Sequence, residues 1–241
     1  EPVTVGYDIY SPQGKLLEFN MQEVTIPGRS TDTVRFTPFI YGTNANKWEP
    51  GAKNPPLYKV MLFTRRDGAY REYMPLKIGF GKTELVDGRL TRFDKELKLV
   101  KARYNAAADR KTTLAELKTL KAKGNNTICP DYPQPGWFYD LCDELGLYVI
   151  DCANINAPEK RDDRKVGGTP SNDPSLADEY LERVKAMYYR SRNHSCVIAF
   201  ALGGESGNGY NMYKAYEWLK SVEKSRPVIC ADADGEWNSD L

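Results

Sequence analysis

The stretch FYDLCDELGLYVI, residues 138–150, decides the fold class of the second half of the chain. Its first apolar residues have the i, i+3, i+4, i+7 spacing of an amphipathic helix: Phe138, Leu141, Cys142 and Leu145. Gly146 is the residue type that most often ends a helix, and the apolar run 147–150 is typical of a strand buried on both faces. A helix that leads directly into a buried strand predicts one unit of an α/β fold with parallel strands.

Helix and strand patterns alternate on both sides of this stretch, over about residues 95–241. The expected strands are 97–100, 126–129, 147–150, 196–202 and 228–230. Thr113 and Glu116 have the spacing of a capping box, which places the start of the first helix at Thr113. Strict alternation of this kind indicates a parallel sheet or a barrel.

Five strands are fewer than the eight of a complete (β/α)8 barrel, which has roughly 250 residues. We therefore interpret residues 87–241 as the first part of such a barrel, strands 1–5, and expect the barrel to be truncated. A small doubly wound domain is the competing fold. No glycine-rich phosphate loop follows the first expected strand, which weakens the nucleotide-binding form of that alternative.

Residues 1–86 show the period-two alternation of β-strands instead. The side chains expected on one face of the first strand are Val3, Val5, Tyr7 and Ile9. A turn is expected at 11–14, and another at 66–68 separates two later strands. Short strands with turns at regular spacing predict an antiparallel β-sandwich over residues 1–86.

The composition weakens several functional classes. Lys and Arg number 34 against 33 Asp and Glu, so a net charge of +1 gives no basic surplus for a nucleic-acid partner. No apolar run approaches the ~18 residues of a membrane span, so no membrane partner is expected. The chain begins at Glu1, inside an expected strand and without Met, which suggests a piece of a longer protein with no signal peptide. The sequence assigns no cellular compartment.

The five cysteines all lie in the second half of the chain: Cys129, Cys142, Cys152, Cys196 and Cys230. Their spacing resembles neither a zinc site nor the disulfide framework of a secreted protein. Most of them lie in apolar runs, so buried free thiols are expected.

Several stretches resemble glycoside hydrolase family 2 of the β-galactosidase type, in the order that the family has them. They are WEP at 48–50, PLY at 56–58, IGF at 78–80, FYDLCDELGLYVID at 138–151, RNH at 192–194, GGESGNG at 203–209 and SRPV at 225–228. The resemblance implies an immunoglobulin-like antiparallel β-sandwich followed by a truncated TIM barrel. It also implies retaining hydrolysis of O-glycosidic bonds in carbohydrates by two carboxylates ~5–5.5 Å apart. The nucleophile would follow a seventh strand, outside this chain, so the chain alone is expected to be inactive.

Glu205 matches the position of the family's catalytic acid/base. It follows an almost wholly apolar run, so it should lie at the carboxyl end of the fourth strand, where barrel enzymes place their active sites. A carboxyl group in a partly dry pocket has a raised pKa and can donate a proton near neutral pH. The alternative is an ordinary glutamate in a surface loop.

The neighbours of Glu205 depart from the family pattern. Gly204 stands where the family has an Asn, and Cys152 and Asn156 replace the two glutamates of an E-A-N-I-E segment. In β-galactosidase members a Glu and a His of that segment help to hold magnesium, and here Asn156 and Pro158 stand in their place. Neither is a good replacement, so the resemblance implies that the magnesium site is lost and that no cofactor or metal is bound.

The remaining candidates for sugar binding are residues near the ends of the expected strands and aromatic residues. The substrate-binding set is Gly204, Asp131, Tyr132, Asn154 and Trp237. Cys129 and Cys152 are expected to end adjacent strands with Cα atoms within ~7 Å, as reduced thiols rather than a disulfide. His194 precedes the fourth strand, so a structural role at the opposite face of the barrel is expected.

Three functions remain open at the level of sequence. The first is a β-galactosidase-like glycoside hydrolase seen as a fragment. The second is a catalytically degenerate carbohydrate-binding pseudoenzyme, and the third is a structural or assembly fragment without a sugar site. The expected partners are a carbohydrate and, through the open barrel edge, a second copy or the missing remainder of the chain, because an uncovered edge exposes backbone groups.

Overall fold

The computed structural model describes residues 2–51 and 54–241. The chain divides into two compact units. Unit 1 comprises residues 1–48 and 55–80, and unit 2 comprises residues 49–54 and 81–241. The strands of unit 1 and those of unit 2 belong to different sheets. The expected change from antiparallel strands to alternating helices and strands along the chain is therefore present.

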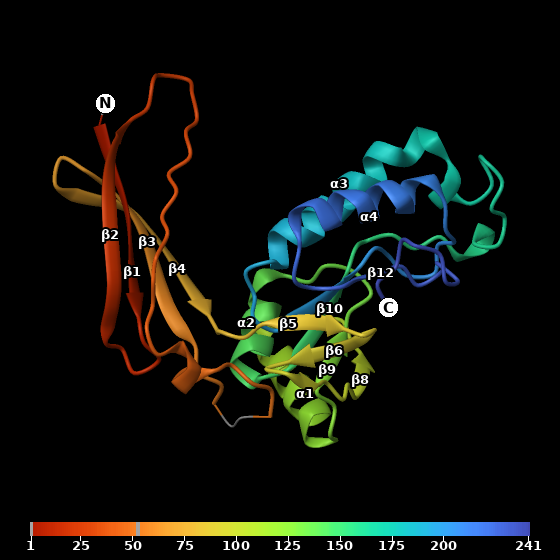
Figure 1. Cartoon of the computed structure of the whole chain (residues 1–241), viewed down its shortest axis with the longest axis horizontal. Helices are drawn as coiled ribbons and strands as arrows, with labels where there is room; N and C mark the ends of the chain where they lie inside the picture. The colour runs from red at the N-terminus through yellow and green to blue at the C-terminus, as the bar shows by residue number, and fades with distance from the viewer. Residues whose placement is uncertain (1, 52–53) are drawn as a thin grey trace. The chain divides into compact units, whose positions relative to one another are not determined.

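Unit 1 contains a four-stranded antiparallel sheet with the order β2-β1-β3-β4 (Figure 1). Its strands are β1 Pro2–Tyr10, β2 Leu16–Thr25, β3 Tyr58–Arg66 and β4 Ala69–Ile78. The expected antiparallel strands are confirmed. The two-sheet sandwich is not: in the described part of unit 1, the segment between β2 and β3 carries one short 3-10 helix, Thr43–Asn46, and no second sheet.

Close packing explains one glycine of this sheet, and a left-handed backbone conformation explains another. The ring of Phe63 lies over Gly6, where an added Cβ would come within 2.5 Å of the ring. Asp67 and Gly68 connect β3 to β4 with positive φ angles of 52° and 73°. Two consecutive residues of this kind form the tight turn that suits the twist of a hairpin. The turn predicted at 66–68 is therefore confirmed.

Unit 2 contains two sheets (Figure 1). The first is antiparallel, with the order β5-β6-β7: β5 Thr83–Val86, β6 Arg89–Arg92 and β7 Lys95–Glu96. The second is parallel: β8 Lys101–Arg103, β9 Thr127–Cys129, β10 Tyr148–Cys152, β11 Val197–Ala201 and β12 Val228–Ile229. The longer helices are α1 Arg110–Ala122, α2 Gly136–Leu145, α3 Ala177–Ser191 and α4 Tyr210–Val222. Three 3-10 helices lie before α3: Pro158–Lys160, Pro170–Asn172 and Pro174–Leu176.

The order of the parallel sheet is sequential, β8-β9-β10-β11-β12. A doubly wound sheet changes direction at a switch point, whereas a barrel adds each strand next to the last. The sequential order therefore favours the barrel interpretation over its rival. Across the described residues, no helix has the length and the apolar character needed to cross a membrane.

Two element boundaries differ from the sequence prediction. The first parallel strand is Lys101–Arg103 rather than 97–100, because Asn126 engages the backbone before it: its side chain accepts from Val100 N at 2.8 Å and donates to Lys98 O at 2.8 Å. Helix α1 begins at Arg110 rather than at Thr113, because the Asp109 carboxylate caps the helix and accepts from Thr112 N at 2.9 Å.

The outer edge of β12 is covered by the residues that follow it. Asp240 N donates to Val228 O at 2.8 Å, and Val228 N donates to the Asp240 carboxylate at 2.7 Å. Cys230 N donates to Ser239 Oγ at 3.1 Å. The expectation that strand 5 would expose unpaired backbone groups is therefore wrong for Val228.

Candidate active site

Glu205 lies in the loop that follows β11, the fourth strand of the parallel sheet, as predicted. The backbone of this loop is bonded to the segment that follows the neighbouring strand β10. Gly204 N donates to Ile155 O at 2.8 Å, and Ala157 N donates to Glu205 O at 3.0 Å. The Cα of Glu205 is thereby fixed at the carboxyl end of the sheet.

The residues after Glu205 are held by a second set of contacts. Ser206 O accepts hydrogen bonds from Thr169 Oγ1 at 2.8 Å and from Ser171 Oγ at 2.7 Å. Gly207 has φ +70°, and an added Cβ there would come within 2.3 Å of Arg161 O. Only glycine fits this position without strain, since it tolerates a left-handed conformation and close backbone contact.

Asp232 joins the Glu205 loop to the end of β12. Its Oδ2 accepts from Ser206 N at 2.8 Å and from Gly207 N at 2.7 Å. Its Oδ1 forms an ion pair with Arg161 Nη2 at 3.0 Å, and Nη1 of the same guanidinium lies 3.4 Å from Glu205 Oε2. Loops from three successive strands thus converge on one carboxylate.

The side chain of Glu205 is 68% exposed, while that of Asp232 is 11% exposed. The partly dry pocket expected around Glu205 is therefore absent from the described residues. What this part of the barrel supplies is a carboxylate on a fixed backbone, with an arginine as its ionic partner.

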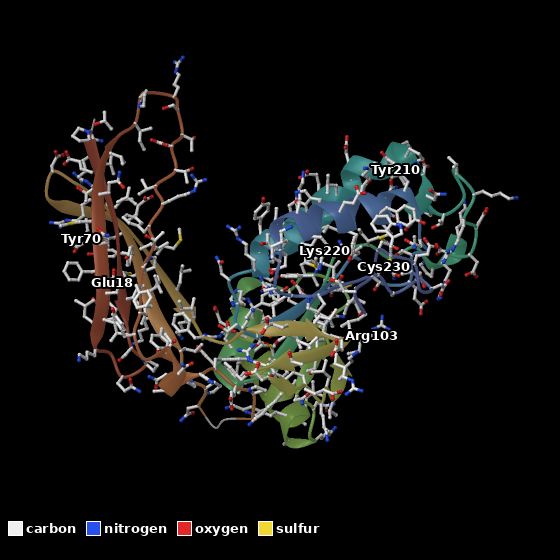
Figure 2. The ribbon with its side chains drawn as sticks, in the orientation of Figure 1. Glu18, Tyr70, Arg103, Tyr210, Lys220 and Cys230 are labelled. Carbon is white, nitrogen blue, oxygen red and sulfur yellow. The ribbon has the colours of Figure 1, made fainter. Side chains whose placement is uncertain are left out.

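Asp131 follows β9 and belongs to a polar network at the ends of the first two parallel strands. It pairs with Arg103, at the end of β8 (Figure 2), and its Oδ2 accepts from Asn105 Nδ2 at 2.8 Å. Burial raises the pKa of this carboxyl, but the hydrogen bonds from Arg103 and Asn105 outweigh it and hold the pKa below its usual range. Asp131 is thus an anionic acceptor. Tyr132 next to it is 46% exposed.

Cys129 and Cys152 end the adjacent strands β9 and β10, as predicted. The pairing of Ile128 with Val149 places Cys152 two residues beyond the level of Cys129. Diagonal neighbours in sheets lie ~7–8 Å apart, which is at or beyond the limit for a disulfide. Both are free thiols, and burial raises the pKa of Cys152 to about 12, so it is not a thiolate. The Cα separation within ~7 Å stays a prediction.

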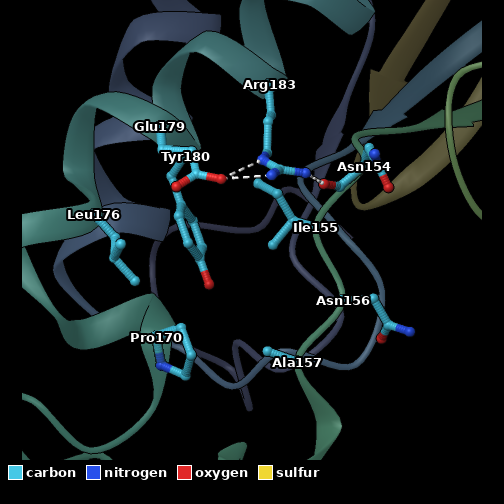
Figure 3. Close-up of a pocket in the computed structure, with 9 residues that line it drawn as sticks. All are labelled: Asn154, Ile155, Asn156, Ala157, Pro170, Leu176, Glu179, Tyr180 and Arg183. Carbon is cyan, nitrogen blue, oxygen red and sulfur yellow. Dashed lines mark hydrogen bonds and ion pairs between the residues drawn. The ribbon is translucent and has the colours of Figure 1, made fainter.

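Asn154 and Asn156 follow β10 and line a cavity of about 200 Å³ beside the start of α3 (Figure 3). Arg183 donates to Asn154 O at 2.7 Å and pairs with Glu179, one turn earlier on α3, at the edge of this cavity. An added Cβ at Gly204 would lie 3.4 Å from Asn156 Oδ1, which is ordinary contact. The substitution of Asn by Gly at position 204 therefore leaves room for a side chain.

Trp237 packs against two tyrosines of α4. Its ring centroid lies 5.3 Å from that of Tyr213 and 5.6 Å from that of Tyr216, and it is 56% exposed. The two tyrosine rings cover part of the Trp237 ring, and more than half of the side chain is exposed to solvent.

His194 precedes β11 and pairs through Nδ1 with Asp143 Oδ2 of α2 at 2.8 Å. The other carboxylate oxygen of Asp143 accepts from Cys196 N at 2.7 Å. The pair fixes the entry of β11 at the amino end of the sheet, so the predicted structural role is consistent with these contacts.

Residues 101–240 match the family described as glycosyl hydrolases family 2, TIM barrel domain. The chain belongs to glycoside hydrolase family 2. The match covers β8 to β12 and includes Glu205, Asp131 and Asn154.

Relatives and solved structures agree with this membership. The chain is 33% identical over 184 residues to a β-galactosidase of Vibrio cholerae and 35% identical over 188 residues to one of Lactococcus lactis. Each match covers 72% of this chain, and the chain spans only 18% of the length of each relative. β-Glucuronidases of Bacteroides uniformis and Parabacteroides merdae share the fold, with TM-scores of 0.76 and 0.71 at 17% and 18% identity. Those matches cover 95% of this chain and 29% and 30% of the solved chains.

Sequence reasoning missed three charged residues of the site: Arg103, Arg161 and Asp232. Asp232 follows an expected strand, and a carboxylate in that position is a signal that could have found it. Arg161 lies in a loop rich in both signs of charge, where no spacing distinguishes it from its neighbours.

Proposed function

We propose that this chain is part of a retaining β-glycosidase of the β-galactosidase type, with Glu205 as its acid/base. The observation that carries the proposal is a carboxylate at the end of the fourth strand whose backbone is fixed from strands 3 and 5. A retaining mechanism needs a second carboxylate ~5–5.5 Å away as the nucleophile. In the proposal this residue follows a seventh strand, so the 241-residue chain alone is inactive.

Sugar hydroxyls would bind to the polar residues around Glu205. Asp131 is an anionic acceptor, and Asn154 offers an amide with both donor and acceptor groups. Tyr132 and Trp237 have exposed aromatic faces that suit the apolar face of a pyranose ring. Gly204 lacks the amide that the family has at this position, so one contact to the sugar would be weaker.

The proposal includes a domain layout and partners. In the proposal, the immunoglobulin-like β-sandwich expected over residues 1–86 has the four-stranded sheet as one of its two layers, although Thr83–Val86 pairs with β6 in unit 2. Residues 87–241 would form the first part of the (β/α)8 barrel. The partner is a carbohydrate, with no cofactor, nucleic acid or membrane, and self-association would use the β12 edge or the rest of the barrel.

Leaving-group dependence tests the role of Glu205. In the complete protein, Glu205→Ala should slow hydrolysis of alkyl β-galactosides by several orders of magnitude, because the leaving oxygen needs a proton. Dinitrophenyl β-galactoside should lose much less in the glycosylation step, because its leaving group needs no proton. Glu217→Gln, on the surface of α4, is the matched control and should change neither rate.

The isolated 241-residue chain gives a second test. It should show no turnover of aryl β-galactosides above background. Turnover that Glu205→Gln abolishes in the isolated chain would contradict the two-carboxylate assignment. Equal losses for good and poor leaving groups in the complete protein would contradict the acid role of Glu205.

A further inference from the structure

The residues around Glu205 do not fit the magnesium ion that β-galactosidase members hold in the corresponding segment. Pro158 offers no side-chain ligand, and Asn156 offers only a neutral amide oxygen. The position beside the Glu205 carboxylate is taken by the positive guanidinium of Arg161. A divalent cation would be repelled there, since two positive charges would share one carboxylate.

We infer that Arg161 is a positioning residue for Glu205, and that it supplies the local positive charge in place of a metal ion. The inference rests on the proposed function of Glu205 and names the residues that orient it. Arg161 acts together with Asp232, which holds the guanidinium in place.

The geometry makes Arg161 a bridge between a buried and an exposed carboxylate. One terminal nitrogen lies 3.0 Å from Asp232 Oδ1, and the other lies 3.4 Å from Glu205 Oε2. Asp232 is itself fixed, because its other oxygen accepts the backbone amides of Ser206 and Gly207. The position of the guanidinium is therefore set by the same carboxylate that anchors the Glu205 loop.

The chemistry of the side chains explains why arginine is needed. A guanidinium is planar and presents separate donors to two acceptors, whereas a lysine ammonium is a single point charge. Glu205 is 68% exposed and would sample several rotamers without a partner. Lysine at position 161 should keep the charge but hold only one of the two carboxylates well.

Removing the guanidinium should also change the affinity of the site for cations. Without Arg161, the carboxylates of Asp232 and Glu205 would face one another without a positive charge between them. Carboxylate oxygens are the ligands that hard divalent cations prefer. Arg161→Gln should therefore weaken the orientation of Glu205 and create affinity for a divalent cation.

The test is an NMR experiment on the isotope-labelled 241-residue chain, and its result does not depend on hydrolysis. Side-chain three-bond couplings of Glu205 should indicate one dominant rotamer in the parent chain, averaged rotamers in Arg161→Gln and an intermediate state in Arg161→Lys. The control is Arg110→Gln, on α1, which removes an exposed arginine that pairs with Glu144 and should leave Glu205 unchanged. Amide shifts of Ser206 and Gly207 should not saturate with MgCl₂ in the parent chain but should do so in Arg161→Gln.

Kinetics in the complete protein complete the test. Arg161→Gln should lower kcat on the order of 10- to 100-fold, with a smaller change in KM, because misplacing a catalytic group affects the chemical step. Arg161→Lys should restore part of kcat. Saturable magnesium binding at Ser206 and Gly207 in the parent chain, or unchanged Glu205 couplings in Arg161→Gln, would overturn the inference. If Glu205→Ala slowed substrates with good and poor leaving groups equally, while the Glu205 couplings still depended on Arg161, the proposed function would be wrong. The positioning of Glu205 by Arg161 would still hold.

Discussion

The antiparallel sheet of unit 1 and the parallel sheet of unit 2 differ most in how their strands are covered. In β11, four of the five residues are buried, whereas β2 has ten residues and none is buried. Helices of the parallel sheet supply this cover: Phe200 of β11 packs against Tyr188 of α3 with ring centroids 5.4 Å apart. In the antiparallel sheet, large apolar side chains such as Phe19 and Met74 are 65% and 58% exposed.

The difference shows where the free energy of folding is concentrated. Each buried apolar side chain contributes roughly 1.5–3 kcal/mol relative to an exposed one. The core residues that β10 and β11 share with α2 and α3 should therefore dominate the stability of unit 2. The antiparallel sheet depends more on hairpin pairing and on the single face that buries Tyr7 and Ile9.

The largest expected effect comes from removing a matched ring in each sheet. Phe200 is fully buried, so Phe200→Ala should lower the free energy of unfolding by about 3–5 kcal/mol. Phe19 is 65% exposed, so Phe19→Ala should change it by less than about 0.5 kcal/mol. Urea denaturation with hydrogen exchange on peptides from each sheet would measure both. Equal losses would show that the contrast in burial does not determine stability.

Local patterns predicted most of the longer elements, but they did not predict β5 to β7 or what covers the antiparallel sheet. The continuous apolar run at 196–202 and the alternation of Val3 to Ile9 each predicted a strand correctly. Alternation says that one face of a strand differs from the other, and it does not say what lies opposite. For this reason the second layer of the sandwich could be expected from the family resemblance but is not seen in the described residues.

The same limit applies to the candidate site. Glu205 was placed correctly because its position depends on a strand that the sequence defines. Its exposure was not predicted, since burial depends on residues far away in the chain. The contacts from Arg161 and Asp232 arise from loops whose conformations depend on one another, so their pairing has no local signature.

Two glycines with similar backbone angles sharpen the comparison. Gly207, in the Glu205 loop, and Gly68, in the β3–β4 turn, have φ +70° and +73°. An added Cβ would have open space at Gly68 but would meet Arg161 O at 2.3 Å at Gly207. Gly68→Ala should cost about 1 kcal/mol for the left-handed backbone. Gly207→Ala should cost about 2–4 kcal/mol, because a backbone contact must also move.

Thermal denaturation of the two glycine variants would separate the conformational cost from the contact cost. Gly204→Ala is the control within the same loop, since its Cβ would make only ordinary contact at 3.4 Å. A loss at Gly204→Ala as large as that at Gly207→Ala would contradict the proposed tight packing of the loop against Arg161.

Asp151 should make the stability of the parallel sheet depend on pH. Its side chain is fully buried, and among the described residues its Oδ2 has no hydrogen-bond partner. Burial raises its pKa from 3.8 to about 6. A raised pKa means that its contribution to stability is present below about pH 4 and is lost as the pH rises through about 6.

Asp151→Asn should therefore stabilise unit 2 at pH 7 by up to about 3 kcal/mol, since the pKa shift is about two units. The gain should be smaller at pH 4, where the carboxyl is already neutral. Asn can still accept the hydrogen bond that Tyr139 donates to Asp151 Oδ1 at 2.8 Å. Urea midpoints of both proteins from pH 4 to pH 7 would test this, and parallel curves would show that Asp151 does not titrate in this range.

The smallest effect is expected at the edge of the parallel sheet. The edge strand β2 of the antiparallel sheet has an exposed charged side chain, Glu23, whereas β12 is paired with Asp240. The Asp240 carboxylate accepts from Val228 N at 2.7 Å, from Tyr216 Oη at 2.6 Å and from Lys220 Nζ at 2.8 Å. Burial raises the pKa of Asp240, but these hydrogen bonds outweigh it and leave the pKa lowered.

A lowered pKa gives Asp240 the opposite pH dependence to Asp151: its stabilisation is present above about pH 4 and is lost as the pH falls through the folded-state value. Asp240→Ala should cost about 1–2 kcal/mol at pH 7, since Val228 N and Lys220 lose a charged acceptor. Hydrogen exchange at the Val228 amide should accelerate, while amides of β2 should not change. Sedimentation of Asp240→Ala would then show whether the uncovered β12 edge drives self-association. If the variant stays monomeric and Val228 stays protected, the edge does not depend on Asp240.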